Sequence, residues 1–271
     1  MVSRVVGNRL REITADSPIS AVDLFCGAGG LTHGLLQAGI RVDAGVDIDR
    51  QAEFAYTRNN PGAVFLNWDV GRKNYTSIEN LFGDGRYRLL AGCAPCQPFS
   101  KLTNGIRDHR AWGLLNHFGR FVSRIRPELV TMENVPELAD RGREVFQRFV
   151  RTLERLEYSV AWEVVNCHEY GVPQSRRRLV LLASRLGEIS IPDGRFKPPS
   201  KWKTVRQAIG SLRQLESGGE DPDDPLHVAS ELSELNLRRI RATPHDVGAP
   251  GHVGATAALR RAGRNVEPQA R

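Results

Sequence analysis

Short apolar segments alternate with amphipathic ones from residue 19 to residue 185, and this alternation is the strongest constraint on the fold. Strands that alternate with helices favour an α/β fold, in which helices cover both faces of a mostly parallel sheet. The apolar segments predict strands at Ile19–Phe25, Arg41–Asp47, Leu89–Ala91, Leu129–Met132 and Leu179–Ala183. Helical spacing predicts helices over Leu31–Gln37, Arg50–Asn59 and Val145–Leu156.

The pattern changes after about residue 186, where prolines interrupt it. The segment from Gly218 to Pro225 is a loop by composition, and a helix is predicted over Ala229–Ile240. Residues 247–271 are rich in Gly, Ala and Arg and have no periodic apolar face. We expect this last segment to be disordered.

The chain has 271 residues and a net charge of +7, carried almost entirely by arginine. A basic chain favours a polyanionic partner, because each phosphate contact releases counterions. A GC-rich gene would give the same arginine bias, so charge alone leaves both explanations open. We expect no membrane partner, since no apolar run is long enough to span a bilayer. The absence of a signal peptide and of a disulfide framework predicts a cytoplasmic protein.

A glycine-rich run, Phe25-Cys26-Gly27-Ala28-Gly29-Gly30, follows the first predicted strand and opens the first helix. Glycines at such a turn let the backbone approach a ligand closely. The run is neither a P-loop nor the Gly-x-Gly-x-x-Gly dinucleotide pattern. Asp47 ends the second strand, where a carboxylate can accept hydrogen bonds from the hydroxyls of a ribose. A helix-capping role for Asp47 is an open alternative.

The run Pro95-Cys96-Gln97-Pro98-Phe99-Ser100 places a thiol in a loop stiffened by two prolines. A thiol held in this way is suited to nucleophilic attack once a nearby positive charge lowers its pKa. Cys93 and Cys96 also form a Cys-x-x-Cys pair, which would fit a redox pair or half of a zinc site. We rank both low, because Pro98 interrupts the loop and no second pair supplies further zinc ligands.

Glu133 follows a buried strand, at the edge of the sheet where open α/β folds bind their ligands. A surface capping role is its open alternative. Further along, Arg176 and Arg178 lie on the same side of a segment that enters another strand. Two arginines at such a position are costly unless they meet an anion, although a plain basic turn also fits the pattern.

In order and spacing these runs resemble the successive motifs of the cytosine-C5 DNA methyltransferases. The matching runs are Asp23–Gly30, Pro95-Cys96-Gln97, Glu133-Asn134-Val135 and Gln174-Ser175-Arg176-Arg177-Arg178. The resemblance covers roughly residues 20–245. The Gln-Pro-Phe-Ser continuation after Cys96 looks like the DNA enzymes rather than the tRNA-acting relatives.

This resemblance implies a Rossmann-like S-adenosylmethionine-dependent methyltransferase sheet and DNA (cytosine-5-)-methyltransferase activity. Cys96 would add to carbon 6 of a flipped cytosine, and Glu133 would hold or donate a proton at ring N3. Arg176 would orient the base, with Arg178 as its companion. S-adenosylmethionine would donate the methyl group, without a metal. The implied cofactor-binding residues are Phe25, Gly27, Gly29, Asp47, Ile48, Asp69 and Pro95. Cys26, Cys93 and Cys167 would be buried structural thiols.

Double-stranded DNA is the implied partner, and a cognate restriction endonuclease is expected in the same bacterial cytoplasm. The implied domains are a leader (1–18), a catalytic domain that binds S-adenosylmethionine (19–200), the start of a target recognition region (201–246) and a disordered tail (247–271).

The family's later Gly-Asn motif is missing from this sequence. We therefore also consider a silent truncated remnant, a frameshift in the tail, and half of a split enzyme completed by a second polypeptide. A sequence-specific DNA-binding regulator ranks below these, because no helix-turn-helix or zinc-finger signal is visible.

Overall fold

The structure, a computed structural model, describes residues 14, 16–95 and 109–243. The chain divides into two compact units, residues 1–208 and residues 209–271, which are described here one at a time. None of the described helices is long and apolar enough to cross a membrane.

The first unit contains seven strands and the helices that connect them. The strands are β1 (Ile19–Leu24), β2 (Arg41–Asp47), β3 (Val64–Asn67), β4 (Tyr87–Gly92), β5 (Leu129–Asn134), β6 (Ser159–Asn166) and β7 (Arg177–Ser184). The helices are α2 (Gly30–Gln37), α3 (Ala52–Asn59), α4 (Tyr75–Glu79), α5 (His109–Ile125), α6 (Glu137–Asp140), α7 (Arg143–Arg155) and α8 (Val205–Ile209), the last of which crosses the boundary between the units. Single turns of 3-10 helix lie at Val70–Arg72, Cys167–Tyr170 and Pro199–Lys201.

The seven strands form one sheet in the order β3-β2-β1-β4-β5-β7-β6. β1 pairs in parallel with β2 and β4, and the pairs β2–β3 and β4–β5 are also parallel. β7 is the exception, because it runs antiparallel to both of its neighbours, β5 and β6. The predicted α/β class with a mostly parallel sheet is therefore confirmed.

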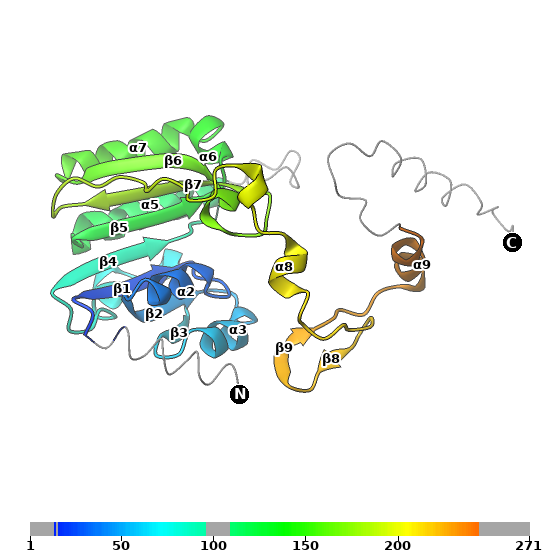
Figure 1. Cartoon of the computed structure of the whole chain (residues 1–271). Coiled ribbons are helices and arrows are strands. Elements are labelled where there is room, and N and C mark those ends of the chain that lie inside the picture. The colour runs from blue at the N-terminus through cyan, green and yellow to red at the C-terminus, as the bar shows by residue number, and fades with distance from the viewer. Residues whose placement is uncertain (1–13, 15, 96–108, 244–271) are drawn as a thin grey trace, which may run out of the picture. The chain divides into compact units, whose positions relative to one another are not determined.

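Helices cover both faces of this sheet, which explains why the central strands are buried along most of their length (Figure 1). On one face, Leu36 of α2 and Tyr56 of α3 pack with Val42, Phe65 and Leu89 of the strands. The other face carries the larger core, in which the rows of apolar side chains on α5 and α7 pack against β4, β5 and β7. The row on α7, predicted from its helical spacing, comprises Val145, Phe146, Phe149 and Leu153.

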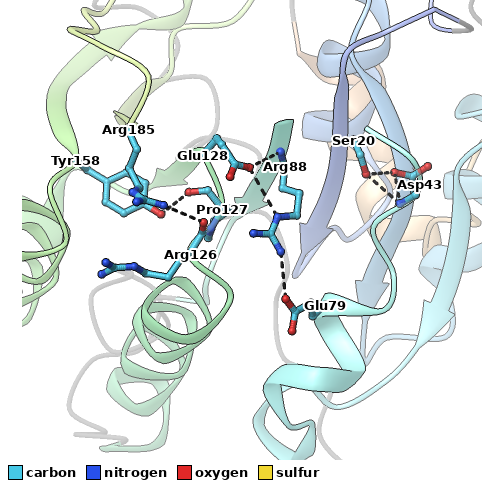
Figure 2. A network of polar contacts seen from close by, with 10 residues as sticks. Ser20, Asp43, Glu79, Arg88, Arg126, Pro127, Glu128, Tyr158 and Arg185 are labelled. Carbon is cyan, nitrogen blue, oxygen red and sulfur yellow. Dashed lines mark hydrogen bonds and ion pairs between the residues drawn. The ribbon is translucent and has the colours of Figure 1, made fainter. Parts of the chain in front are cut away.

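A row of polar contacts fastens the amino ends of the parallel strands (Figure 2). Arg88, near the start of β4, lies 3.1 Å from Glu79, and its backbone N–H donates to the Glu128 carboxylate over 2.8 Å. The Ser20 hydroxyl donates to Asp43, which joins β1 to β2. The Tyr158 hydroxyl donates to the Pro127 carbonyl next to β5. These contacts hold the sheet at the edge that lies opposite the candidate site.

The second unit has a two-stranded antiparallel hairpin, β8 (Glu220–Asp221) and β9 (Asp224–Val228), and the helix α9 (Glu234–Ala242). Asp221 lies 3.2 Å from the His227 ring across this hairpin. The helix predicted from residue 229 begins later, because the Ser233 side chain accepts a hydrogen bond from the Asn236 N–H and caps it there.

Candidate active site

The predicted site residues gather at the carboxyl edge of the sheet, because the parallel strands end there and the antiparallel β7 begins there. Those that the structure describes are Phe25, Gly27 and Gly29 after β1, Asp47 and Ile48 at the end of β2, Asp69 after β3, Pro95 after β4, Glu133 in β5, and Arg176 and Arg178 at the start of β7. Cys96 lies outside the described residues, directly after Pro95.

The glycine-rich turn after β1 adopts left-handed backbone angles, with φ of 60° at Phe25, 50° at Gly27 and 86° at Gly29. A Cβ atom at Gly29 would lie 2.2 Å from the Asn60 side chain and 2.7 Å from the Tyr56 ring, so packing alone demands glycine there. A Cβ at Gly27 would meet nothing within 4 Å, which leaves open space on that side of the turn. The turn thus offers bare backbone to a ligand.

Asp47 ties the end of β2 to this turn. One carboxylate oxygen accepts a hydrogen bond from the Gly27 N–H over 2.8 Å, and the other accepts one from the Asp49 N–H, also over 2.8 Å. The helix-capping alternative for Asp47 does not hold, because α3 begins only at Ala52 and its N-cap is Gln51. The next residue, Ile48, exposes 68% of its surface at the same edge, which suits the flat face of a ring.

Asp69 lies two residues after β3, just before the 3-10 turn Val70–Arg72. One of its carboxylate oxygens accepts a hydrogen bond from the Gly71 N–H over 2.9 Å, and the other lies 3.1 Å from the Arg72 guanidinium. Both contacts are local, so they fix the direction of the carboxylate without burying it.

A buried polar network lies beneath the glycine-rich turn. Asp23 of β1 is completely buried, and one of its oxygens accepts a hydrogen bond from the Thr32 hydroxyl of α2 over 2.7 Å. The Thr32 hydroxyl also lies 3.3 Å from the hydroxyl of Tyr56, so the network reaches α3. The other Asp23 oxygen has no hydrogen-bond partner among the residues that the structure describes. Burial is the main reason that the pKa of Asp23 rises from 3.8 to about 7.

We expect Asp23 to make the protein less stable as the pH rises. Its pKa is higher in the folded protein than in the unfolded chain, so folding favours the protonated acid. The contribution of Asp23 to the unfolding free energy is therefore complete below about pH 3.8 and is lost as the pH rises toward 7. Asp23→Asn keeps the oxygen that accepts from Thr32 and removes the charge. Relative to wild type, this variant should gain roughly 2–3 kcal/mol of unfolding free energy between pH 5 and pH 8. Urea unfolding of both proteins at these two pH values measures the gain. If the two proteins differed in unfolding free energy by the same amount at pH 5 and at pH 8, the prediction would be contradicted.

Glu133 lies in β5 beside a guanidinium group. The Nε atom of Arg178, on the adjacent strand β7, is 2.6 Å from one Glu133 oxygen, and the Arg178 side chain is only 15% exposed. Burial raises the pKa of Glu133 above its ordinary value, while Arg176 and a hydrogen bond with the Cys93 side chain act in the opposite direction. The carboxyl group can therefore hold a proton at a higher pH than an exposed glutamate does.

Asn134, the residue after Glu133, joins this strand to the segment that leads to Cys96. Its buried side-chain N–H₂ donates to the Ala94 carbonyl over 2.9 Å, and its side-chain oxygen accepts from the Val135 N–H over 2.9 Å. The Cys93 N–H in turn donates to the Leu24 carbonyl at the end of β1. The ends of β1, β4 and β5 are thereby fixed to one another, two residues before the thiol of Cys96.

The three arginines at the start of β7 take different positions. Arg176 precedes the strand and is exposed, Arg177 is exposed, and Arg178 is the half-buried partner of Glu133. The charge of Arg176 also lowers the pKa values of Glu133 and Cys167, which places it near both groups. Arg178 is therefore the arginine that faces the Glu133 carboxylate, whereas the exposed Arg176 can reach a ligand.

The cysteines differ in burial and in surroundings. Cys26 is buried, whereas Cys93 and Cys167 are half-buried, and all three are free thiols. Burial raises the pKa of each. Within the described residues, no group of three or more His, Cys, Asp or Glu side chains is arranged to hold a metal ion.

Sequence reasoning missed Asp23 and Asn134 as supports of the site. A signal existed for Asp23, since a carboxylate in an otherwise apolar strand must find a partner in the interior. Asn134 lies in the run Glu133-Asn134-Val135 that resembles the family, but its role depends on the approach of β4 to β5, which the sequence does not specify.

Two curated proteins are similar to this chain over much of its length. Type II methylase M.HgiDII of Herpetosiphon aurantiacus is 43% identical over 223 residues, which are 82% of this chain and 62% of that protein. Type II methyltransferase M.XorII of Xanthomonas oryzae pv. oryzae is 33% identical over 201 residues, which are 72% of this chain and 47% of that protein. The chain therefore spans about half to three fifths of the length of these relatives.

A solved structure shares the fold. It is a prophage-encoded E. coli protein described as a DNA modification methyltransferase, with a TM-score of 0.62 and 27% identity over 74% of this chain and 57% of that one. Residues 19–244 match the family described as C-5 cytosine-specific DNA methylase. This match covers β1 through α9 and every site residue considered above, and the chain belongs to that family.

Proposed function

We propose that this chain methylates carbon 5 of cytosine in double-stranded DNA through a covalent adduct with Cys96. The observation that carries the proposal is the pairing of Glu133 with Arg178 at 2.6 Å, on a strand that Asn134 ties to the Cys96 segment. A proton-holding carboxyl group and the residues that lead to Cys96 are thus held beside a turn of bare backbone. The names of the relatives, which are Type II methylases, favour the same activity.

S-adenosylmethionine suits the residues at the ends of β1, β2 and β3. The open space at Gly27 admits a ligand against the backbone, and the free lone pairs on Asp47 can accept the hydroxyls of a ribose. Exposed Ile48 can pack on the adenine face, and Asp69 can accept from the adenine amino group. Phe25, Gly29 and Pro95 line the same pocket in this proposal. When bound, S-adenosylmethionine supplies the methyl group.

The residues of the chain prepare the base for that group. The Cys96 thiolate forms a bond to carbon 6, and the electron pair of the C5–C6 double bond shifts toward carbon 4. The C4–N3 electron pair moves onto N3, which takes a proton from Glu133, so that carbon 5 becomes the nucleophilic end of an enamine. Arg176 orients the base, and Arg178 keeps Glu133 in place. After methylation, the carbon-5 proton passes to water, the C5–C6 double bond forms again as the Cys96 thiolate leaves, and the N3 proton returns to Glu133.

DNA is the substrate in this proposal, and the target base must leave the duplex because carbon 6 is inaccessible to a thiolate within the stack. We also propose that residues 201–246 begin the region that reads the target sequence. The separate compact unit from residue 209 supports this assignment, and so do its exposed apolar side chains, which include Leu212, Val228, Leu235 and Ile240. A cognate restriction endonuclease would recognise the same sequence.

Methyl transfer from labelled S-adenosylmethionine tests the proposal directly. The purified chain is incubated with a mixed-sequence duplex and with a matched duplex in which 5-methylcytosine replaces every cytosine. We expect label on carbon 5 of cytosine in the first duplex and none in the second. Equal labelling of both would place the methyl group on another atom, and labelling of neither would contradict the proposed activity.

A further inference from the structure

Helices α5 and α7 pack directly against each other on one face of the sheet. The rings of Phe118 and Phe149 lie 5.8 Å apart, and a Cβ atom at Gly119 would come within 3.3 Å of the Phe149 ring. The small Gly119 thus lets the two helices approach closely. Four exposed arginines lie on these two helices, and we call them the arginine groove: Arg120 of α5 and Arg148, Arg151 and Arg155 of α7.

The seam is hollowed at one place, and a second hollow lies beside it on α7. One hollow of about 330 Å³ is lined by Arg120 and Arg148, together with the polar side chains of Asn116, Ser123 and Thr152. A second hollow of about 660 Å³ is lined by Arg148, Arg151, Glu154 and Arg155. Arg148 belongs to both hollows, so the two form one basic surface along α7. Donor groups predominate on it, with Glu154 as its single acidic side chain.

Some described arginines form ion pairs, whereas the four arginines of the groove do not. Arg41, Arg72 and Arg88 each lie within 3.1 Å of a carboxylate oxygen. Within the described part of the chain, none of the four arginines of the groove has a carboxylate oxygen within 4.0 Å, Glu144 and Glu154 of α7 included. Among the described residues, Arg155 donates side-chain hydrogen bonds to the Arg151 carbonyl and the Thr152 hydroxyl, neither of which carries a charge.

The positive field of the groove reaches its neighbours. The pKa of His117 on α5 is lowered, first by burial and second by the charge of Arg120. Unpaired like charges so close together repel each other, so the surface favours an anion that can contact several of them. Guanidinium groups bind phosphate oxygens in pairs of parallel hydrogen bonds, and no acidic residue here occupies those donors.

We propose that the arginine groove binds the phosphate backbone of duplex DNA, independently of sequence and outside the site that receives the target cytosine. Arg148, Arg151 and Arg155 recur at intervals of three and four residues, so they rise along one side of α7 by about 4.5 Å and 6 Å. A regular row of this kind matches a regularly charged polymer better than a single small anion. The choice of DNA as the polyanion rests on the proposed function.

Salt dependence of DNA binding tests this proposal. The full chain, without cofactor, is titrated with a fluorescent adenine–thymine duplex that contains no cytosine, at several salt concentrations. Each phosphate contact contributes about 0.9 to the slope of log affinity against log salt concentration. The triple variant Arg148→Gln, Arg151→Gln and Arg155→Gln should therefore lose up to about 2.7 from that slope. The matching lysine variant, which keeps the charges, should retain most of it.

A second triple variant controls for net charge. Arg58→Gln, Arg86→Gln and Arg195→Gln remove three exposed charges from other parts of the first unit. The slope of this variant should differ from that of wild type by no more than about 0.9, the contribution of one phosphate contact. An unchanged slope in the groove variant, or equal losses in both variants, would overturn the proposal. This duplex has no cytosine and the assay contains no methyl donor, so the binding result does not depend on methyl transfer. A failed methylation assay and a failed test of the arginine groove can therefore be told apart.

Discussion

Cys96→Ser should abolish methyl transfer, with a loss of roughly 10⁴-fold to 10⁶-fold, as when other enzymes lose their nucleophile. A serine hydroxyl has nearly the same size as the thiol but is a far weaker nucleophile at neutral pH, so the adduct at carbon 6 does not form. The affected step is chemical, and the variant should still bind DNA. Label incorporation into a cytosine-containing duplex measures the loss, and binding of the same duplex verifies that the protein is intact.

A duplex with 5-fluorocytosine at the target site separates this explanation from a general loss of structure. Fluorine at carbon 5 cannot leave as the proton does, so the wild-type adduct should persist and survive denaturing electrophoresis. Cys96→Ser should form no such complex, whereas Cys167→Ser, the same change at the half-buried Cys167, should form it. Turnover by Cys96→Ser, or a trapped complex without the thiol, would show that another residue attacks the base.

Much of the fold could be predicted because local pattern and tertiary role agree. The structure has β2 at the predicted Arg41–Asp47, since that strand is bounded by glycine on one side and by a polar loop on the other. Two strands of the seven-stranded sheet were missed, and so was the β8–β9 hairpin, which lies partly in the segment predicted as a loop. β3 has only four residues, and β6 is an edge strand with Trp162 and Glu163 exposed, so neither shows a clear period.

The direction of β7 depends on that missed strand. Only Cys167–Tyr170 and a short turn separate β6 from β7, which is too short for the crossover that parallel neighbours need. Once β6 is known, the short connection implies that β7 pairs with it in the antiparallel direction. Helix α5 was also missed, although Leu115, Phe118, Val122 and Ile125 recur at helical spacing and are buried. Gly113 and Gly119 weakened its sequence signal, yet Gly119 is needed for the close approach to Phe149.

The candidate site was predicted as a set of residues rather than as a geometry. Motif order identified Glu133, Arg176 and Arg178, with Arg178 as the companion of Arg176, but it did not pair Arg178 with Glu133. The ion pair between Glu133 and Arg178 arises from the pairing of β5 with β7, a long-range register that no local pattern encodes. The same holds for the Asn134 contact with Ala94, which joins residues 40 positions apart.

Glu133→Gln should lower the rate of methyl transfer by roughly 10²-fold to 10⁴-fold, the range typical for loss of a general acid. The amide still reaches ring N3 as a hydrogen-bond donor but has no proton to give. Its size matches the carboxyl group, so β5 should keep its pairing with β7. Arg178 loses the charge of its partner but keeps an oxygen that can accept from it. Thermal unfolding of the variant should therefore stay close to that of wild type.

The pH profile distinguishes proton donation from mere support. Burial raises the pKa of Glu133, and the protonated acid is the form that serves N3, so the wild-type rate should fall as the pH rises through that raised pKa. Glu133→Gln has no proton to lose there, so its residual rate should lack this alkaline decline. Glu137→Gln, the same change in the adjacent α6, should retain both the rate and the decline. If Glu133→Gln were slow but kept the wild-type alkaline decline, Glu133 would orient the base without donating the proton, and another group would titrate in its place.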